Sequence, residues 1–110
     1  MNLVPLEQLS FESFAGLVKT NFRLWLNEQE GMDLELFEIT PRSVAATGGA
    51  NGPKYENFAL MFRGPADRQL AQQIYLFESA QIGRFELFIV PVGRDQNGAL
   101  YQATFNRRLK

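Results

Sequence analysis

Two carboxylates, Asp33 and Glu35, have the residue type and spacing that a catalytic pair needs. Residues two apart on a β-strand point to the same face, about 7 Å from each other, and carboxylates at such a distance can hydrolyse glycosidic bonds. These two acids alternate with Met32, Leu34 and Leu36, however, which is the pattern of a strand with one solvated face. Catalytic carboxylates usually lie in a pocket and come from separate elements. We therefore interpret the pair as part of a solvated surface.

The sequence contains neither cysteine nor histidine. This excludes disulfides, Cys/His zinc sites, thiolate nucleophiles, Ser-His-Asp triads and imidazole bases. An enzyme would have to work with Asp, Glu, Lys, Arg, Tyr, Ser and Thr, and these residues form no convergent set in the sequence. We therefore predict a protein that is not an enzyme, with no catalytic residues, no cofactor and no metal.

A stretch of small residues at 43–54 contains Gly48, Gly49 and Gly52, which invites comparison with loops that bind phosphate. A Walker loop follows a strand, precedes a helix and ends in Gly-Lys-Ser/Thr. Here the glycines are followed by Pro53 and by residues that lead into a predicted strand. The pattern therefore predicts a flexible connection between two strands, over residues 43–54.

Basic residues gather at the C-terminal end of the sequence, at Arg107, Arg108 and Lys110. Together with Tyr101 and Phe105 they could bind single-stranded nucleic acid through charge and stacking. The whole chain, however, has 11 Lys and Arg against 12 Asp and Glu, a net charge of −1. This balance favours a solvated strand edge that discourages further pairing. We expect no nucleic-acid partner and no membrane partner.

Aromatic side chains make up 13% of the chain, enough to fill an interior and leave some over. In one interpretation, a barrel wall and one helix bury both faces of the strands. In the other, an exposed apolar patch binds another chain, with Trp, Tyr and Arg side chains as anchors. The candidate interaction residues are Arg23, Trp25, Tyr75, Phe77, Tyr101 and Arg107.

Charge is distributed unevenly along the chain. Residues 1–40 carry two bases and seven acids, a net charge of −5, whereas residues 41–110 carry nine bases and five acids, a net charge of +4. Opposite poles on one molecule would suit head-to-tail or ring-like association. Pairing of the two halves within one molecule explains the same charges equally well.

The length of 110 residues suits a single domain spanning residues 1–110. Phe11, Phe14, Ala15 and Val18 recur with helical period and predict one short N-terminal helix at residues 10–19, with Ser10 as its N-cap. From there on the apolar period is two. The predicted strands span residues 21–27, 32–40, 55–63, 73–79, 85–92 and 99–107.

Several breaks in the alternation predict where these strands bend, end and turn. The apolar pair Leu36-Phe37 indicates a β-bulge near Leu36. Pro41 is expected to end its strand. Hairpin turns are expected at residues 80–83 and at 95–98, where Asn97-Gly98 favours a tight turn.

These elements predict a mainly β (α+β) fold. About six antiparallel strands form a meander that curls into a small barrel or a strongly curled sheet, with the helix packed on it as a plug or lid. The strand at 85–92 is apolar on both faces, so something must cover its second face. That cover is either the helix or a partner chain.

A series of short segments resembles a family of small bacterial proteins catalogued as a domain of unknown function. The segments are Phe58 to Pro65 (FALMFRGP), Tyr75, Ile82-Gly83, Leu87 to Gly93 (LFIVPVG), and Tyr101 through Phe105-Asn106-Arg107. The resemblance covers about residues 56–108. It implies that the genes of this family are often neighbours of phage-tail-like and tail-collar-like genes. It implies no catalytic residues.

We therefore expect a non-enzymatic structural or protein-interaction module. In the context that the resemblance implies, this module would be an accessory of a phage-tail-like or surface-fibre assembly. The expected partner is another protein or a second copy of the chain. The alternative is a small β-barrel that binds a small apolar ligand between helix and sheet.

The first fifteen residues have no Lys or Arg and no unbroken apolar run, and no segment approaches the ~18 apolar residues of a membrane span. The expected location is the cytoplasm or an exported assembly.

Overall fold

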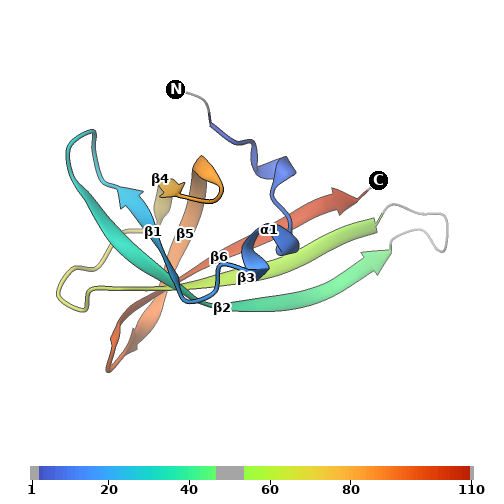
Figure 1. Cartoon of the computed structure of the whole chain (residues 1–110). Coiled ribbons are helices and arrows are strands. Elements are labelled where there is room, and N and C mark those ends of the chain that lie inside the picture. The colour runs from blue at the N-terminus through green and yellow to red at the C-terminus, as the bar shows by residue number, and fades with distance from the viewer. Residues whose placement is uncertain (1–2, 47–53, 110) are drawn as a thin grey trace.

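The structure is a computed structural model that describes residues 3–46 and 54–109, with side chains described at 3–40 and 57–106. Figure 1 shows a mostly β molecule whose short helical elements lie near the N-terminus. The helical elements are η1 (Leu6–Gln8) and α1 (Phe11–Ala15). The strands are β1 (Thr20–Trp25), β2 (Gly31–Ala46), β3 (Lys54–Gly64), β4 (Gln73–Ser79), β5 (Gly83–Asp95) and β6 (Gly98–Leu109).

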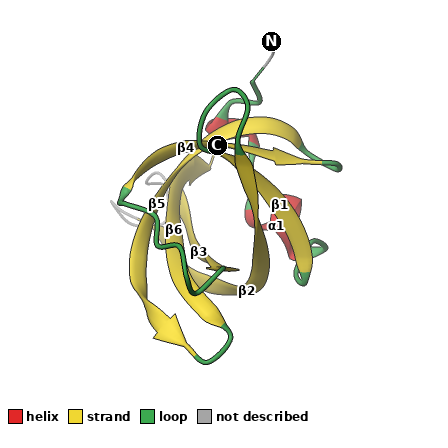
Figure 2. Cartoon of the chain, turned by 90° about the vertical axis from the view of Figure 1, so that its left-hand side faces the viewer, coloured by secondary structure: helices red, strands yellow, loops and turns green. Residues whose placement is uncertain are grey.

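Within the described residues, six strands close into a barrel in the order β1-β2-β3-β6-β5-β4, and each of their pairings is antiparallel. Figure 2 shows the strands arranged around a common axis. Closure rests on pairing of β1 with β4 at three positions, from Arg23↔Glu78 to Trp25↔Leu76. The predicted mainly β barrel with one short N-terminal helix is confirmed.

The predicted simple meander is wrong, because β3 pairs with β6 and not with β4. The chain from 65 to 72 crosses one end of the barrel and places β4 beside β1. Alternation in a sequence specifies which residues share a face, whereas the choice of neighbouring strand depends on long-range packing.

The second strand is longer than predicted. A register shift between Leu36 and Glu38 confirms the bulge near Leu36. Pro41 does not end the strand, since it pairs with Phe58 and β2 continues to Ala46. A second register shift follows Pro41, and such an irregularity accommodates a residue without a backbone N–H.

The predicted loop at 43–54 is correspondingly shorter, because residues 43–46 belong to β2 and Lys54 begins β3. Residues 47–53 of that predicted loop lie outside the described residues. The two predicted hairpin turns are confirmed by the pairs Ser79↔Gly83 and Asp95↔Gly98.

The helix is a single turn rather than the ten residues predicted. Ser10 caps it as expected, in a capping box with Ser13. Gly16 is the C-cap, and Lys19 adopts a positive φ of 75°, which takes the chain out of the helical region. The Lys19 N–H then donates to the Leu36 carbonyl oxygen at 2.6 Å, so a backbone contact with β2 replaces further helical turns.

Phe14 on α1 closes one end of the barrel. Its side chain is fully buried. It contacts one ring from each of four strands, with centroid distances of 5.4–6.3 Å. These rings belong to Phe22, Phe58, Phe85 and Phe105. One side chain thus joins strands that do not all pair with one another.

The connection from 65 to 72 covers the opposite end of the barrel. Leu70 is buried there, and its backbone N–H donates to the hydroxyl of Tyr101 at 2.9 Å. The Tyr75 hydroxyl donates to the Ala71 carbonyl oxygen, also at 2.9 Å. The polar ends of two interior tyrosines therefore satisfy backbone groups of this connection.

Candidate functional site

The outer surface of β1, β4 and β5 gathers the polar and apolar groups that could bind a ligand or partner. Strand alternation turns Arg23 and Trp25 outward from β1, and the register brings them beside residues of the neighbouring strands. Three rows cross this outer face: Arg23 with Glu78 and Arg84, Trp25 with Leu76 and Glu86, and Ile74 with Phe88.

Trp25 is held in place by polar contacts on this face. Its Nε1–H donates to Oε1 of Glu78 at 3.0 Å, and Nε of Arg84 lies 3.4 Å from the same oxygen. The Arg23 guanidinium lies over the indole, 5.3 Å from the ring centroid, and is paired with Asp33 at 3.1 Å. A cation at this distance from a tryptophan ring is attracted by its quadrupole.

A hollow of about 480 Å³ lies beside this tryptophan and includes Trp25, Asn27, Glu28, Leu76 and Arg84 in its wall. The indole also reaches toward β2, where Gly31 has no side chain to block it. A Cβ on Gly31 would lie 2.8 Å from Nε of Arg23 and 3.1 Å from Cε3 of Trp25. The glycine thus leaves room for the Arg23–Trp25 arrangement.

An apolar patch lies on the same side of the barrel, formed by Leu3, Leu6, Ile74 and Phe88. Their exposed fractions are 43%, 40%, 60% and 46%. Ile74 and Phe88 face each other across β4 and β5, and all four residues line one hollow of about 290 Å³. Val4, between the leucines, donates its N–H to the Arg84 carbonyl oxygen at 2.8 Å. The N-terminal segment is thereby fixed against β5.

The sheet is splayed beside this patch. β5 pairs with β6 from Val90 onward, and the earlier residues of β5 form no ladder with β6 within the described chain. A hollow of about 490 Å³ lies between the two strands, with Leu6 and Phe88 on one side and Thr104 and Asn106 on the other. Phe88 therefore borders two hollows.

The structure separates the predicted interaction residues whose side chains it describes into two groups. Arg23 and Trp25 lie together on the outer face. Tyr75, Phe77 and Tyr101 are buried, so the prediction that they lie on an exposed patch is wrong. In a closed barrel every second residue of each strand points into a shared interior, and these three residues are among the inward-pointing ones. Arg107 belongs to β6, and its side chain lies outside the described residues.

The apolar patch was absent from the predicted site residues. The signal for it was the apolarity of both faces of the strand at 85–92, which required a cover for the second face. α1 does not provide this cover, because Phe14 enters the barrel instead. η1 contacts β5, yet Phe88 remains 46% exposed. Leu3 and Leu6 gave no periodic signal of their own.

The carboxylate pair Asp33 and Glu35 lies on an exposed strand surface, as expected. Each acid faces an arginine: Asp33 pairs with Arg23 at 3.1 Å, and Glu35 pairs with Arg63 at 3.6 Å. The described part of the chain contains no cluster of three or more His, Cys, Asp or Glu side chains that could hold a metal ion.

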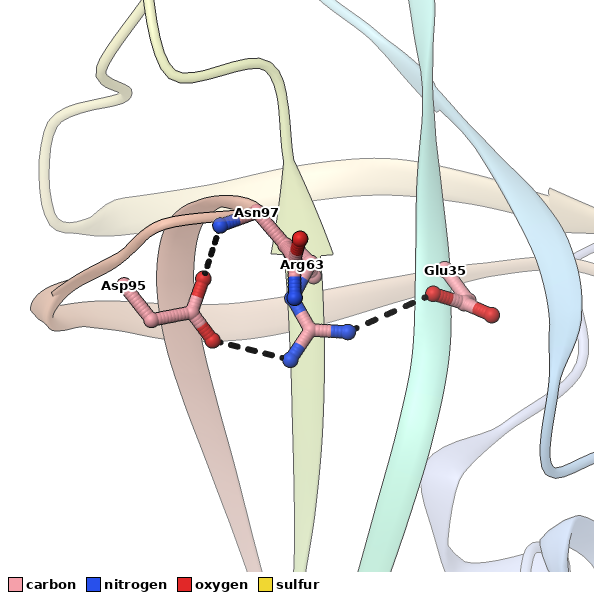
Figure 3. A network of polar contacts seen from close by, with 4 residues as sticks. All are labelled: Glu35, Arg63, Asp95 and Asn97. Carbon is pink, nitrogen blue, oxygen red and sulfur yellow. Dashed lines mark hydrogen bonds and ion pairs between the residues drawn. The ribbon is translucent and has the colours of Figure 1, made fainter.

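Arg63 connects three strands near the β5–β6 hairpin (Figure 3). Its guanidinium bonds Oδ2 of Asp95 at 2.9 Å, reaches Glu35, and lies 4.2 Å from the ring centroid of Phe37. The hydrogen bond from Arg63 lowers the pKa of Asp95 below its usual 3.8, and the backbone N–H of Asn97 lowers it further. The charged form of Asp95 is therefore favoured in the folded state.

We expect Asp95→Asn to flatten the acid dependence of stability. Because folding lowers the pKa of Asp95, its carboxylate stabilises the protein at neutral pH, and this contribution is lost as the pH falls below 3.8. Urea unfolding at a series of acidic pH values measures the slope. Asp67→Asn is the control, since Asp67 forms no ion pair with the described residues. Equal slopes for the two variants would contradict the assignment.

The described residues contain no helix long and apolar enough to cross a membrane. Fold and site together define a small closed antiparallel β-barrel, plugged by one helical turn, with a tryptophan-lined hollow and an apolar patch on its outer wall. The chain belongs to the family described as Domain of unknown function (DUF6916), whose model matches residues 9–105. This confirms the resemblance to a family of unknown function. No curated protein matches the chain, and no solved structure does.

Proposed function

We propose that this protein is a non-enzymatic interaction module that binds another protein chain through the apolar patch. The observation that carries this proposal is the pair Ile74 and Phe88, which are 60% and 46% exposed and face each other on the outside of β4 and β5. Single exposed apolar residues are common, whereas a contiguous group is typical of an interaction surface.

The surroundings of the patch suit an interface. Leu3 and Leu6 extend the apolar surface, and the backbone bond from Val4 to Arg84 limits how far this segment can move. Glu86 lines the hollow between Leu3 and Phe88 and supplies a charged rim. An apolar centre with a charged rim is the usual anatomy of a protein–protein contact.

The biological setting that we propose is an accessory role in a phage-tail-like or surface-fibre assembly, in the cytoplasm or after export with that assembly. This part rests on the gene neighbourhood that the family resemblance implies. The opposite net charges of residues 1–40 and 41–110 give less support to an assembly role, because Arg63 pairs with Glu35 and Arg68 pairs with Glu30. These ion pairs join the acidic and basic halves of the chain within one molecule.

The alternative function, a small apolar ligand held between helix and sheet, has weaker support. Phe14 takes up the space between α1 and the barrel, where its ring contacts Phe22, Phe58 and Phe85. A ligand there would have to displace a fully buried aromatic side chain.

Self-association is the simplest form of this proposal, and light scattering during size-exclusion chromatography tests it. We expect the mass of the wild type to rise with concentration. The double variant Ile74→Asp/Phe88→Asp should weaken association by at least about a hundredfold, since each buried apolar side chain contributes about 1.5–3 kcal/mol. Weak dependence on salt is expected, because the contact is apolar.

Gln73→Asp is the control for added charge, because it places one negative charge, against two in the double variant, at an exposed position of β4 without removing apolar surface. It should associate like the wild type. An oligomer that persists in the double variant would exclude the apolar patch as its interface. A wild type that stays monomeric at every concentration would contradict self-association.

A further inference from the structure

The hollow beside Trp25 combines a flat aromatic ring, an aliphatic side chain and hydrogen-bonding groups. Its volume of about 480 Å³ falls within the ~300–1,000 Å³ typical of small-molecule sites. We infer that this hollow binds a neutral sugar, with a pyranose ring stacked on Trp25 and its hydroxyls bonded to Glu28 and Arg84. The inference is independent of the proposed function, because none of the described residues that line this hollow belongs to the apolar patch.

The tryptophan is fixed before any ligand arrives. Its Nε1–H is engaged by Glu78, which is also held by Arg84, and the two carboxylate contacts are 3.0 and 3.4 Å long. A ring whose orientation is already set loses little conformational entropy when it becomes a stacking platform. The aliphatic C–H groups of a pyranose face carry slight positive charge and suit the negative face of an indole.

The charges around the hollow disfavour an ionic ligand. A cation would approach a ring over which the Arg23 guanidinium already lies, and it would meet Arg84 in the wall. An anion would meet Glu28 in the wall and Glu78 beside the indole. Since the two signs oppose each other, a neutral ligand encounters the smallest electrostatic penalty.

The polar wall also disfavours a purely apolar ligand. Burying the Glu28 carboxylate and the Arg84 guanidinium under such a ligand would remove their water without replacing the hydrogen bonds. A sugar has hydroxyl groups that donate to the carboxylate and accept from the guanidinium. It therefore matches both the apolar platform of Trp25 and Leu76 and the polar rim.

Trp25 is the single tryptophan of the chain, so its fluorescence reports on this hollow alone. We would titrate the whole protein with glucose, galactose, mannose and N-acetylglucosamine. The expected result is a saturable fluorescence change with at least one sugar, with a Kd on the order of 1–10 mM. Choline and acetate, a cation and an anion, should give no saturable change.

Two variants with intact Trp25 connect the signal to the site. Glu28→Ala, in the exposed turn after β1, should raise the Kd about tenfold through loss of a charged hydrogen-bond partner. Phe88→Ala, in the apolar patch, should leave the Kd unchanged. The inference is overturned if no sugar gives a saturable change, if choline or acetate does so, or if Glu28→Ala binds the sugar like the wild type.

Discussion

Phe14→Ala should lower the free energy of unfolding by about 3–5 kcal/mol, the usual cost of deleting a buried phenylalanine ring. The side chain is fully buried and contacts rings from β1, β3, β5 and β6. Its removal would leave a cavity where these strands are held together by side-chain packing. Small domains are stable by about 5–15 kcal/mol, so a large share of that stability would be lost. Urea denaturation followed by circular dichroism measures the change.

Leu6→Ala is the matched control for this prediction. Leu6 also lies in the N-terminal helical region, yet it is 40% exposed, so its truncation should cost less than about 1 kcal/mol. A loss below 1 kcal/mol for Phe14→Ala as well would mean that the barrel does not depend on α1 as a plug. A large loss for both variants would mean that the whole N-terminal segment packs cooperatively.

Gly98→Ala should destabilise the protein by about 3 kcal/mol, because two separate effects add. Gly98 has a φ of +150°, which an L-residue side chain rarely adopts. An added Cβ would also overlap the carbonyl oxygen of Gly64 and lie 3.1 Å from Cγ of Arg63. The shift needed to relieve this contact would disturb the arginine that joins Glu35 to Asp95. Thermal and urea unfolding both measure the loss.

Gly16→Ala is the contrasting substitution. An added Cβ at Gly16 meets no atom of the described residues within 4 Å outside its own helix and chain neighbours, and its φ of −83° is ordinary for any residue. Alanine there should change stability by no more than about 1 kcal/mol, in the stabilising direction, because it restricts the unfolded chain. If both variants were equally stable, the tight contact at Gly98 would not constrain the hairpin.

Local sequence patterns predicted the elements of this fold well. The period of two identified all six strands, the pair Leu36-Phe37 marked the bulge, and Asn97-Gly98 marked the final hairpin. Ser10 was correctly identified as a helix cap. These signals depend on residues close together in the chain, which is why the sequence contains them.

Long-range contacts explain the errors. The helix was predicted too long because the backbone bond from Lys19 to Leu36 of β2 directs the chain to the sheet soon after the C-cap Gly16. The meander was wrong because β3 meets β6, a choice made by strands more than thirty residues apart. Alternation alone did not indicate that the strand faces with Phe77 and Tyr101 point into the barrel. Each of these strands also carries apolar side chains on its other face.

The candidate site shows the same division. The sequence alone determined that Arg23 and Trp25 share a strand face and that the strand at 85–92 has more apolar surface than one interior can bury. Only the tertiary structure brought Glu78 to the indole of Trp25, across 53 residues of sequence. The physical reason is barrel closure, because the pairing of β1 with β4 is the contact that joins the two ends of the sheet.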